Sequence, residues 1–217
     1  MLALMDEHGI ARAIASSVVA IVYDMEEGNA RVAELVETSD RFLGYVVVNP
    51  NFPERSRREM DRYFRHPSFV GAKIHPGYSR SPIASERTQA LIAEVAARGK
   101  PLLIHTAGAG EVEALDRATQ ASGPPVIMAH AGGDAWREGI RAAAQNQRLY
   151  LDLCSSYAER DKVGQALAVA GAEKTVFGSD MDLIHPGFML AMFDSVDMSD
   201  AERGRILAGN ARSIFRL

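Results

Sequence analysis

The sequence predicts an α/β protein of the TIM-type (β/α)8 barrel class, with the first strand missing from this chain. Short apolar runs alternate with stretches of helical periodicity at about 25–30 residues per strand–helix unit, which is the spacing of repeated βαβ units. Several apolar runs are continuous rather than alternating, and this is typical of a parallel sheet covered on both faces. No linker-like stretch interrupts the pattern, so we expect one domain over residues 1–217.

Each element has a local signal. The opening residues L-A-L-M-D-E-H-G predict a short helix that ends at Gly9, since glycine is favoured just past the end of a helix. Apolar runs predict seven strands, at 13–20, 42–48, 69–75, 101–105, 126–130, 149–154 and 175–180. Stretches with helical periodicity and a polar face predict the other helices, at 29–39, 54–65, 85–98, 111–121, 135–146, 159–170 and 199–214.

The number and order of these elements favour the barrel. Seven strand–helix repeats that follow an opening helix fit an eightfold barrel without its first strand. An open doubly wound sheet is the alternative. It is less favoured because no glycine-rich phosphate loop follows the first predicted strand.

Composition excludes several classes of partner. A formal net charge of −4 gives no electrostatic footprint for nucleic acid or an anionic membrane surface. No apolar run approaches the ~20 residues of a membrane span, and the N-terminus lacks the basic region of a secretory signal. Cys154 is the only cysteine, so no intramolecular disulfide can form, and we interpret it as a small buried residue rather than a catalytic thiol. We therefore expect a cytoplasmic protein that acts on a small molecule.

Four chemically active side chains lie at the ends of predicted strands: His75, His105, His130 and Asp180. In a barrel of this class the carboxyl ends of the strands meet at one mouth, where the active site is built. A single histidine at such a position is more often a hydrogen-bonded structural residue. Three ends in register, however, bring together two imidazoles and a carboxylate, a set that suits Zn²⁺, Mn²⁺ or Fe²⁺. We predict His105, His130 and Asp180 as metal ligands.

The motifs around these residues resemble a known family. They are G-A-K-I-H-P (71–76), I-H-T-A-G (104–108), A-H-A-G-G (129–133), F-G-S-D (177–180) and the closing G-N-A-R-S-I-F (209–215). In this order the set is similar to the amidohydrolase superfamily, in its amidohydrolase-related branch that includes aminocarboxymuconate-semialdehyde decarboxylase. The resemblance covers nearly the whole chain.

The resemblance implies a role for each residue. His105 matches a metal-ligating histidine, His130 matches a histidine that acts as acid and base, and Asp180 matches an aspartate that holds the metal and accepts a proton from water. Lys73 and His75 are expected near the substrate, with a metal-bridging carbamate on Lys73 as a less favoured alternative. The implied cofactor is one divalent metal ion, foremost zinc, with manganese or iron as alternatives. A homodimer is also implied.

One element of the family's pattern is absent. Its first strand ends in His-x-His, two further metal ligands, and no His-x-His occurs in this sequence. His8 lies on the opening helix and cannot replace that pair. We interpret the absence as loss of the segment that carried the first strand, with a degenerate family member as the alternative. In either case we expect this chain to bind metal weakly or not at all.

The predicted function is metal-dependent hydrolysis of a small carbonyl substrate (a lactone, an amide or an ester) by activated water, with His130 and Asp180 as the catalytic residues. One alternative is a metal-dependent non-oxidative decarboxylase of the same branch, which would use the same residues. The other is a catalytically inactive barrel or binding module, which the absent His-x-His supports. Secondary candidates are Trp136, Asp182 and His185 near the mouth, and His66 as a residue that caps a helix end.

Overall fold

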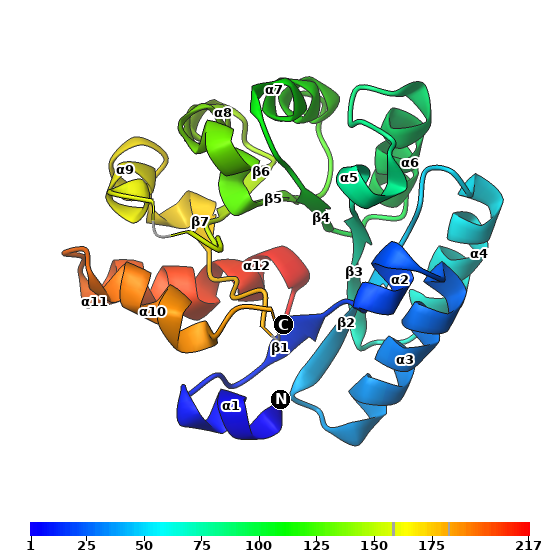
Figure 1. Cartoon of the computed structure of the whole chain (residues 1–217), viewed down its shortest axis with the longest axis horizontal. Coiled ribbons are helices and arrows are strands. Elements are labelled where there is room, and N and C mark those ends of the chain that lie inside the picture. Colours follow the sequence, from blue (N-terminus) through cyan, green and yellow to red (C-terminus); the bar gives the residue numbers. More distant parts are fainter. Residues whose placement is uncertain (158, 182) are drawn as a thin grey trace. The chain divides into compact units, whose positions relative to one another are not determined.

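The computed structural model describes residues 1–157, 159–181 and 183–217, which form two compact units. The N-terminal unit comprises Leu2–His105, and the C-terminal unit comprises Thr106–Leu217 together with Met1. Within each unit, parallel strands follow one another in chain order, with helices between them (Figure 1). This alternation is that of the predicted α/β class.

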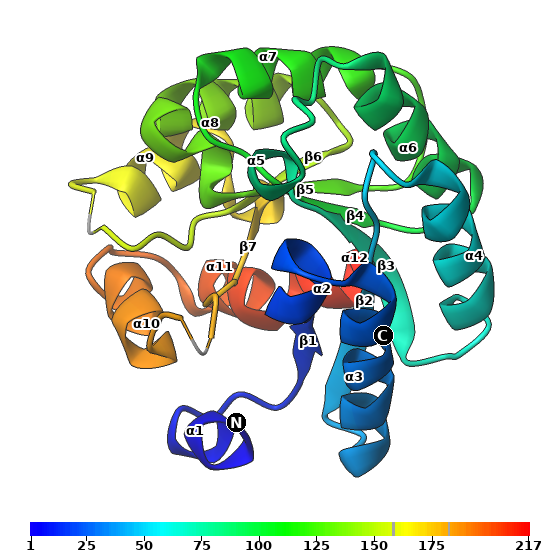
Figure 2. The ribbon, with the colours of Figure 1, turned by 45° about the vertical axis from the view of Figure 1, so that its right-hand side comes forward.

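The N-terminal unit is built on four parallel strands in the order β1-β2-β3-β4. Strands β2 and β3 are buried along their whole length, as their continuous apolar runs predict. Helix α3 packs on β2, and helix α6 packs on β4 (Figure 2). The elements are α1 (Leu2–Glu7), β1 (Ala13–Ala15), α2 (Val18–Val22), α3 (Met25–Thr38), β2 (Phe42–Val47), α4 (Pro53–Tyr63), β3 (Phe69–Ile74), α5 (Pro76–Ser79), α6 (Glu86–Ala97) and β4 (Leu102–His105).

The C-terminal unit carries three parallel strands in the order β5-β6-β7. Its elements are α7 (Ala109–Ala118), β5 (Val126–Ala129), the 3₁₀ turn η1 (His130–Ala135), α8 (Trp136–Gln145), β6 (Leu149–Asp152), α9 (Lys162–Val169), η2 (Ala172–Lys174), β7 (Thr175–Val176), α10 (Pro186–Asp194), α11 (Asp200–Gly204), the π-helical turn η3 (Arg205–Gly209) and α12 (Asn210–Phe215). In the described parts of both units, no helix combines the length and apolar character needed to cross a bilayer.

The prediction of a strand over 13–20 is wrong in its second half. Only Ala13–Ala15 form strand β1, and the apolar residues that follow form helix α2. The reason is tertiary packing, because a Cβ atom on Gly28 of helix α3 would lie 2.1 Å from the backbone nitrogen of Ala20. This close approach of α2 to α3 overrides the strand preference of the β-branched residues.

The last predicted strand, 175–180, is also too long. Strand β7 ends at Val176, and the next backbone N–H, that of Phe177, donates a hydrogen bond to the carbonyl of Ile206 in η3. This contact diverts the chain from the sheet. The helix predicted over 199–214 is in turn divided into α11, η3 and α12.

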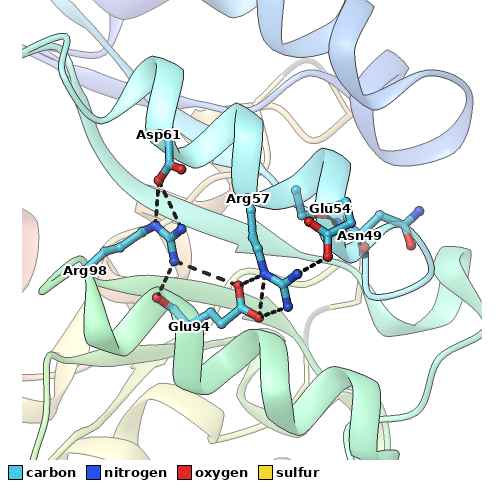
Figure 3. Close-up of polar contacts among 7 residues, drawn as sticks. Asn49, Glu54, Arg57, Asp61, Glu94 and Arg98 are labelled. Atoms are coloured by element: carbon cyan, nitrogen blue, oxygen red, sulfur yellow. Dashed lines mark hydrogen bonds and ion pairs between the residues drawn. The ribbon is translucent and has the colours of Figure 1, made fainter.

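An ion-pair network joins helices α4 and α6 on the surface of the N-terminal unit (Figure 3). Arg57 Nη2 lies 2.7 Å from Glu94 Oε1, and Arg57 also pairs with Glu54. Arg98 Nη2 lies 3.0 Å from Asp61 Oδ1, and Nη1 donates to the backbone carbonyl of Glu94 over 3.1 Å. Because these groups are partly exposed to solvent, each pair adds little stability alone.

A buried amide ties helix α3 to strand β2. The Asn29 side chain, which has no exposed surface, accepts a hydrogen bond from Val47 N (2.9 Å) and donates one to Val47 O (3.0 Å). It also donates to Glu59 Oε2 of helix α4 over 2.9 Å. Burial raises the pKa of the Glu59 carboxyl, and the Asn29 hydrogen bond partly opposes that rise. Asn29 thus satisfies polar groups on two elements at once.

We expect Asn29→Ala to lower the free energy of unfolding by roughly 1–3 kcal/mol, because the buried Val47 peptide groups and the Glu59 carboxyl lose their hydrogen-bond partner. Urea unfolding followed by circular dichroism measures the change. The matched control is Asn51→Ala, at an exposed asparagine whose side chain donates to the Ser79 carbonyl at the surface, and it should shift stability by no more than about 1 kcal/mol. Equal effects of the two substitutions would contradict this role.

Candidate active site

The loop after strand β5 holds His130 in a strained backbone conformation. His130 and Ala131 have φ angles of 64° and 53°, in the left-handed region that residues with a Cβ atom rarely adopt. Gly132 and Gly133 follow with φ angles of 98° and 57°, which glycine adopts without strain. Non-glycine residues in such conformations cluster at functional sites. The backbone conformation therefore identifies His130 as a candidate functional residue, independently of the chemistry of its side chain.

The imidazole of His130 is oriented by a backbone carbonyl. Its Nδ1 lies 2.9 Å from the carbonyl oxygen of Cys154, which follows strand β6. A carbonyl oxygen can only accept, so Nδ1 must carry the proton and donate it. In the neutral ring Nε2 then holds the lone pair, which is the arrangement needed to bind a metal ion or accept a proton.

Two further side chains hold the backbone of this loop. Thr106, which has no exposed surface, donates from Oγ1 to Ala129 O (2.7 Å) and accepts from Gly132 N (2.9 Å). Lys162, at the first turn of α9, has a fully buried side chain, and its Nζ lies 3.5 Å from the carbonyl oxygen of His130. The same ammonium lies 3.3 Å from Glu159 Oε1. These contacts offset the cost of the left-handed backbone at His130.

Helix α8 approaches the same loop at a glycine. A Cβ atom on Gly139 would lie 1.9 Å from the carbonyl oxygen of Ala131, a distance that real side chains cannot reach. Gly139 is therefore required by close backbone packing rather than by its φ angle. It lets α8 support the residue that follows His130.

Asp152 and Cys154 lie beside His130. We predicted Cys154 to be a small buried residue and assigned no role to Asp152. Both are buried. Asp152 Oδ1 accepts from Cys154 N over 2.9 Å, and Cys154 Sγ lies 3.4 Å from both Asp152 Oδ2 and His130 Nδ1. The available signal was positional, because L-D-L-C ends a strand just as the motifs with His105 and His130 do.

Asp180 lies in the loop beyond β7 and is exposed. The prediction that it ends a strand is wrong, because β7 stops four residues earlier. Its φ angle of 50° places it, like His130, in the left-handed region. Its carbonyl accepts hydrogen bonds from Leu183 N and Ile184 N, both over 3.0 Å. The secondary candidate Asp182 is outside the described residues.

In the N-terminal unit, the strand-end histidines His75 and His105 stack on each other. Their ring centroids are 3.9 Å apart and the ring planes are inclined by 16°. His75 follows β3, and its Nδ1 accepts from Tyr78 N over 3.4 Å. The Tyr78 ring, 63% exposed, meets the His75 ring edge-on at 4.6 Å. The predicted placement of both histidines at adjacent strand ends is confirmed.

Lys73 lies two residues before His75 on β3 and is buried, with 7% of its surface exposed. Its backbone carbonyl accepts from Val48 N over 2.9 Å, which continues the pairing of β2 with β3. Its role near the substrate stays a prediction.

The secondary candidates have structural contacts. His185 is the N-cap of α10, and its Nδ1 accepts from Gly187 N over 3.2 Å. His66 Nδ1 accepts from Ser68 N over 3.2 Å in the turn after α4, close to the predicted capping role. Trp136 is 4% exposed and packs at the start of α8.

The three predicted ligands are divided between the units. His105 ends the N-terminal unit, whereas His130 and Asp180 belong to the C-terminal unit. Within their units, His105 is joined to His75 by stacking, and His130 is joined to Cys154 by a hydrogen bond. The shared metal site of His105, His130 and Asp180 stays a prediction.

Comparison with known proteins extends these observations. The sequence profile described as Amidohydrolase matches residues 2–217. The chain belongs to the amidohydrolase family. The resemblance drawn from the strand-end motifs is thereby confirmed. No curated protein matches the sequence of this amidohydrolase.

Solved structures resemble this amidohydrolase over its full length. A 2,6-dihydroxybenzoate decarboxylase from Rhizobium is 16% identical and has a TM-score of 0.79. The superposition covers 99% of this chain and 87% of the decarboxylase. A dihydroxybenzoic acid decarboxylase from a Polaromonas species, solved with manganese and the inhibitor 2-nitroresorcinol, is 21% identical, with a TM-score of 0.75 over 100% and 85%. An uncharacterized TIM-barrel protein from Bordetella bronchiseptica is 17% identical, with a TM-score of 0.80 over 100% and 81%. These likenesses confirm the predicted barrel class.

We expect Gly139→Ala to displace the His130 loop and to lower the free energy of unfolding by about 1–3 kcal/mol, because its Cβ atom would overlap the Ala131 carbonyl. The measurement is thermal or urea unfolding of the purified variant, together with its crystal structure.

Gly204→Ala is the matched control for this substitution. Gly204 also lies in a helix, α11, but nothing lies within 4 Å of the Cβ atom that the substitution would add. It should leave stability unchanged or raise it by up to about 1 kcal/mol, since alanine favours the helix. A Gly139→Ala protein as stable as the wild type would show that α8 does not support the loop.

Proposed function

We propose that this amidohydrolase-family chain is a metal-dependent, non-oxidative decarboxylase of a small aromatic carboxylic acid. The observation that carries the proposal is the full-length similarity to the dihydroxybenzoate decarboxylases. It favours the decarboxylase alternative over the hydrolase that the sequence first suggested.

The donor chemistry of the predicted ligands fits a divalent metal ion. Imidazole nitrogens and a carboxylate suit manganese, iron and zinc. Manganese is favoured over zinc because the Polaromonas decarboxylase was solved with manganese. His105 and Asp180 would hold the ion, and His130 would face it. A divalent ion in this place supplies positive charge that polarises and orients the oxygen atoms of the substrate.

His130 is proposed to carry the proton. When protonated, its Nε2 donates a proton to the ring carbon that bears the carboxylate. The electron pair of the carbon–carboxylate bond then returns to the ring, and CO₂ leaves. The neutral imidazole that remains is held with its proton on Nδ1 by the Cys154 carbonyl, so that Nε2 can be protonated again by solvent.

The N-terminal unit supplies the proposed substrate contacts. The exposed Tyr78 ring and the stacked rings of His75 and His105 offer aromatic surface to a planar substrate. Lys73 offers positive charge to the substrate carboxylate. The homodimer implied by the resemblance also remains part of the proposal.

The second candidate is hydrolysis of a lactone, amide or ester, and the family description Amidohydrolase favours it. There His130 and Asp180 would accept the proton of an attacking water. The third candidate, a non-catalytic barrel, is favoured by the absence of His-x-His.

The test is to incubate the full chain with 2,6-dihydroxybenzoate, with and without added manganese, and to measure the release of CO₂. We expect turnover that depends on an excess of manganese, since two ligands, His105 and Asp180, would bind it weakly. A chelator should abolish this turnover. His130→Ala should lower kcat by roughly 10²- to 10⁴-fold, the usual contribution of a positioned acid. His66→Ala, which alters an exposed histidine paired with Glu37, should leave kcat unchanged.

Other outcomes separate the candidates. Metal-dependent hydrolysis of lactones or esters without CO₂ release would replace the decarboxylase by the hydrolase. If the chain shows neither activity and binds no manganese in equilibrium dialysis, the non-catalytic barrel is favoured. Equal activity of His130→Ala and the wild type would remove His130 from the site.

A further inference from the structure

We propose that Asp152 is a positioning residue for His130, which it orients through the backbone of Cys154. The inference rests on the proposed function only in giving His130 the role of proton carrier. The geometry itself belongs to the C-terminal unit and involves the end of β6 and the loop after β5.

The Asp152 carboxylate makes two contacts with one residue. Oδ1 accepts from Cys154 N over 2.9 Å, and Oδ2 lies 3.4 Å from Cys154 Sγ. A carboxylate only accepts, so both the amide N–H and the thiol S–H of Cys154 point toward it. These two bonds fix the peptide and the side chain of Cys154 at the point where β6 ends.

Cys154 in turn determines the tautomer of the His130 imidazole. The Cys154 carbonyl, on the other side of the same residue, accepts the proton of His130 Nδ1 over 2.9 Å, and Sγ lies 3.4 Å from the same nitrogen. Because the thiol proton is directed to Asp152, the sulfur faces Nδ1 as an acceptor. Both groups near Nδ1 therefore favour the tautomer with the proton on Nδ1. This chain of contacts runs from Asp152 through Cys154 to His130.

The neighbouring segment leaves room for the carboxylate. A Cβ atom on Gly178 would lie 2.3 Å from Asp152 Oδ2 and 2.4 Å from Oδ1, so any larger residue would push the carboxylate away. Gly178 belongs to F-G-S-D, the motif that ends in Asp180. The motif needs a glycine at this position in this chain because the Asp152 carboxylate occupies the space that a side chain would fill.

A purely structural role for Asp152 is the competing explanation. A buried carboxylate that accepts from the second residue after it is a common way to fix a strand end. The two roles differ in one observable. If Asp152 acts on His130, its removal changes the tautomer of the His130 ring. If it only fixes the strand end, stability falls and the ring is unaffected.

The experiment is ¹⁵N NMR of the histidine ring nitrogens in the metal-free full chain, at a pH where the rings are neutral, with His130 assigned through His130→Gln. In the wild type we expect the proton of His130 on Nδ1. In Asp152→Ala we expect the two ring signals to move toward each other, as the tautomers mix. Asp152→Asn, which keeps an oxygen to accept from Cys154 N, should restore much of the wild-type pattern.

Two further variants sharpen the comparison. Cys154→Ala keeps the backbone carbonyl and should leave the proton on Nδ1. Asp116→Ala is the matched control, since it removes a carboxylate that accepts from Asn146 in the same unit without contact to the loop. It should lower stability and leave the His130 signals unchanged.

With active enzyme, Asp152→Ala should lower kcat by about 10- to 100-fold with KM within about twofold, the pattern of a residue that acts through another. Wild-type signals with the His130 proton on Nε2 would overturn the proposal, even if Asp152→Ala failed to fold. A folded Asp152→Ala with unchanged His130 signals would also overturn it. The NMR result does not depend on turnover, so it remains decisive if the decarboxylase proposal fails.

Discussion

The hydrogen bond from His130 Nδ1 to the carbonyl of Cys154 is the interaction on which the candidate site depends. It determines which ring nitrogen carries the proton and links the ends of two parallel strands. The left-handed backbone at His130 makes this hydrogen bond costly to maintain, since such a conformation costs of order 1–3 kcal/mol. Thr106, Lys162 and Gly139 surround the loop with contacts that offset this cost, so the geometry of the ring is a property of the whole unit.

A second constraint is the parallel order of the strands. Because the strands of each unit run in the same direction, their carboxyl ends lie along one edge, and residues distant in sequence become neighbours. His75 and His105 illustrate this in the N-terminal unit, where two residues 30 positions apart in the chain have rings that stack at 3.9 Å. His130 and Cys154 illustrate it in the C-terminal unit. The candidate site residues of each unit therefore lie at the carboxyl ends of its strands or just beyond them.

The sequence was sufficient for the class of fold, the family and most strand positions, because continuous apolar runs and their spacing are strong local signals. It was sufficient for the placement of His75, His105 and His130 at strand ends for the same reason. It failed at residues 16–20, where packing of Ala20 on Gly28 makes a helix, and at Asp180, where a hydrogen bond from Phe177 to η3 ends the strand early. It also missed Asp152, because a carboxylate that acts through the backbone of another residue has no signature in residue type or spacing.

The central proposal is that His105 and Asp180 hold a metal ion that His130 faces. The most direct measurement is X-ray diffraction at the manganese absorption edge, from crystals of the full chain grown with saturating manganese. The account predicts one anomalous peak bound by a His105 ring nitrogen and the Asp180 carboxylate, with Nε2 of His130 facing it. A peak bound by other residues, or none at saturating manganese, would contradict the claim.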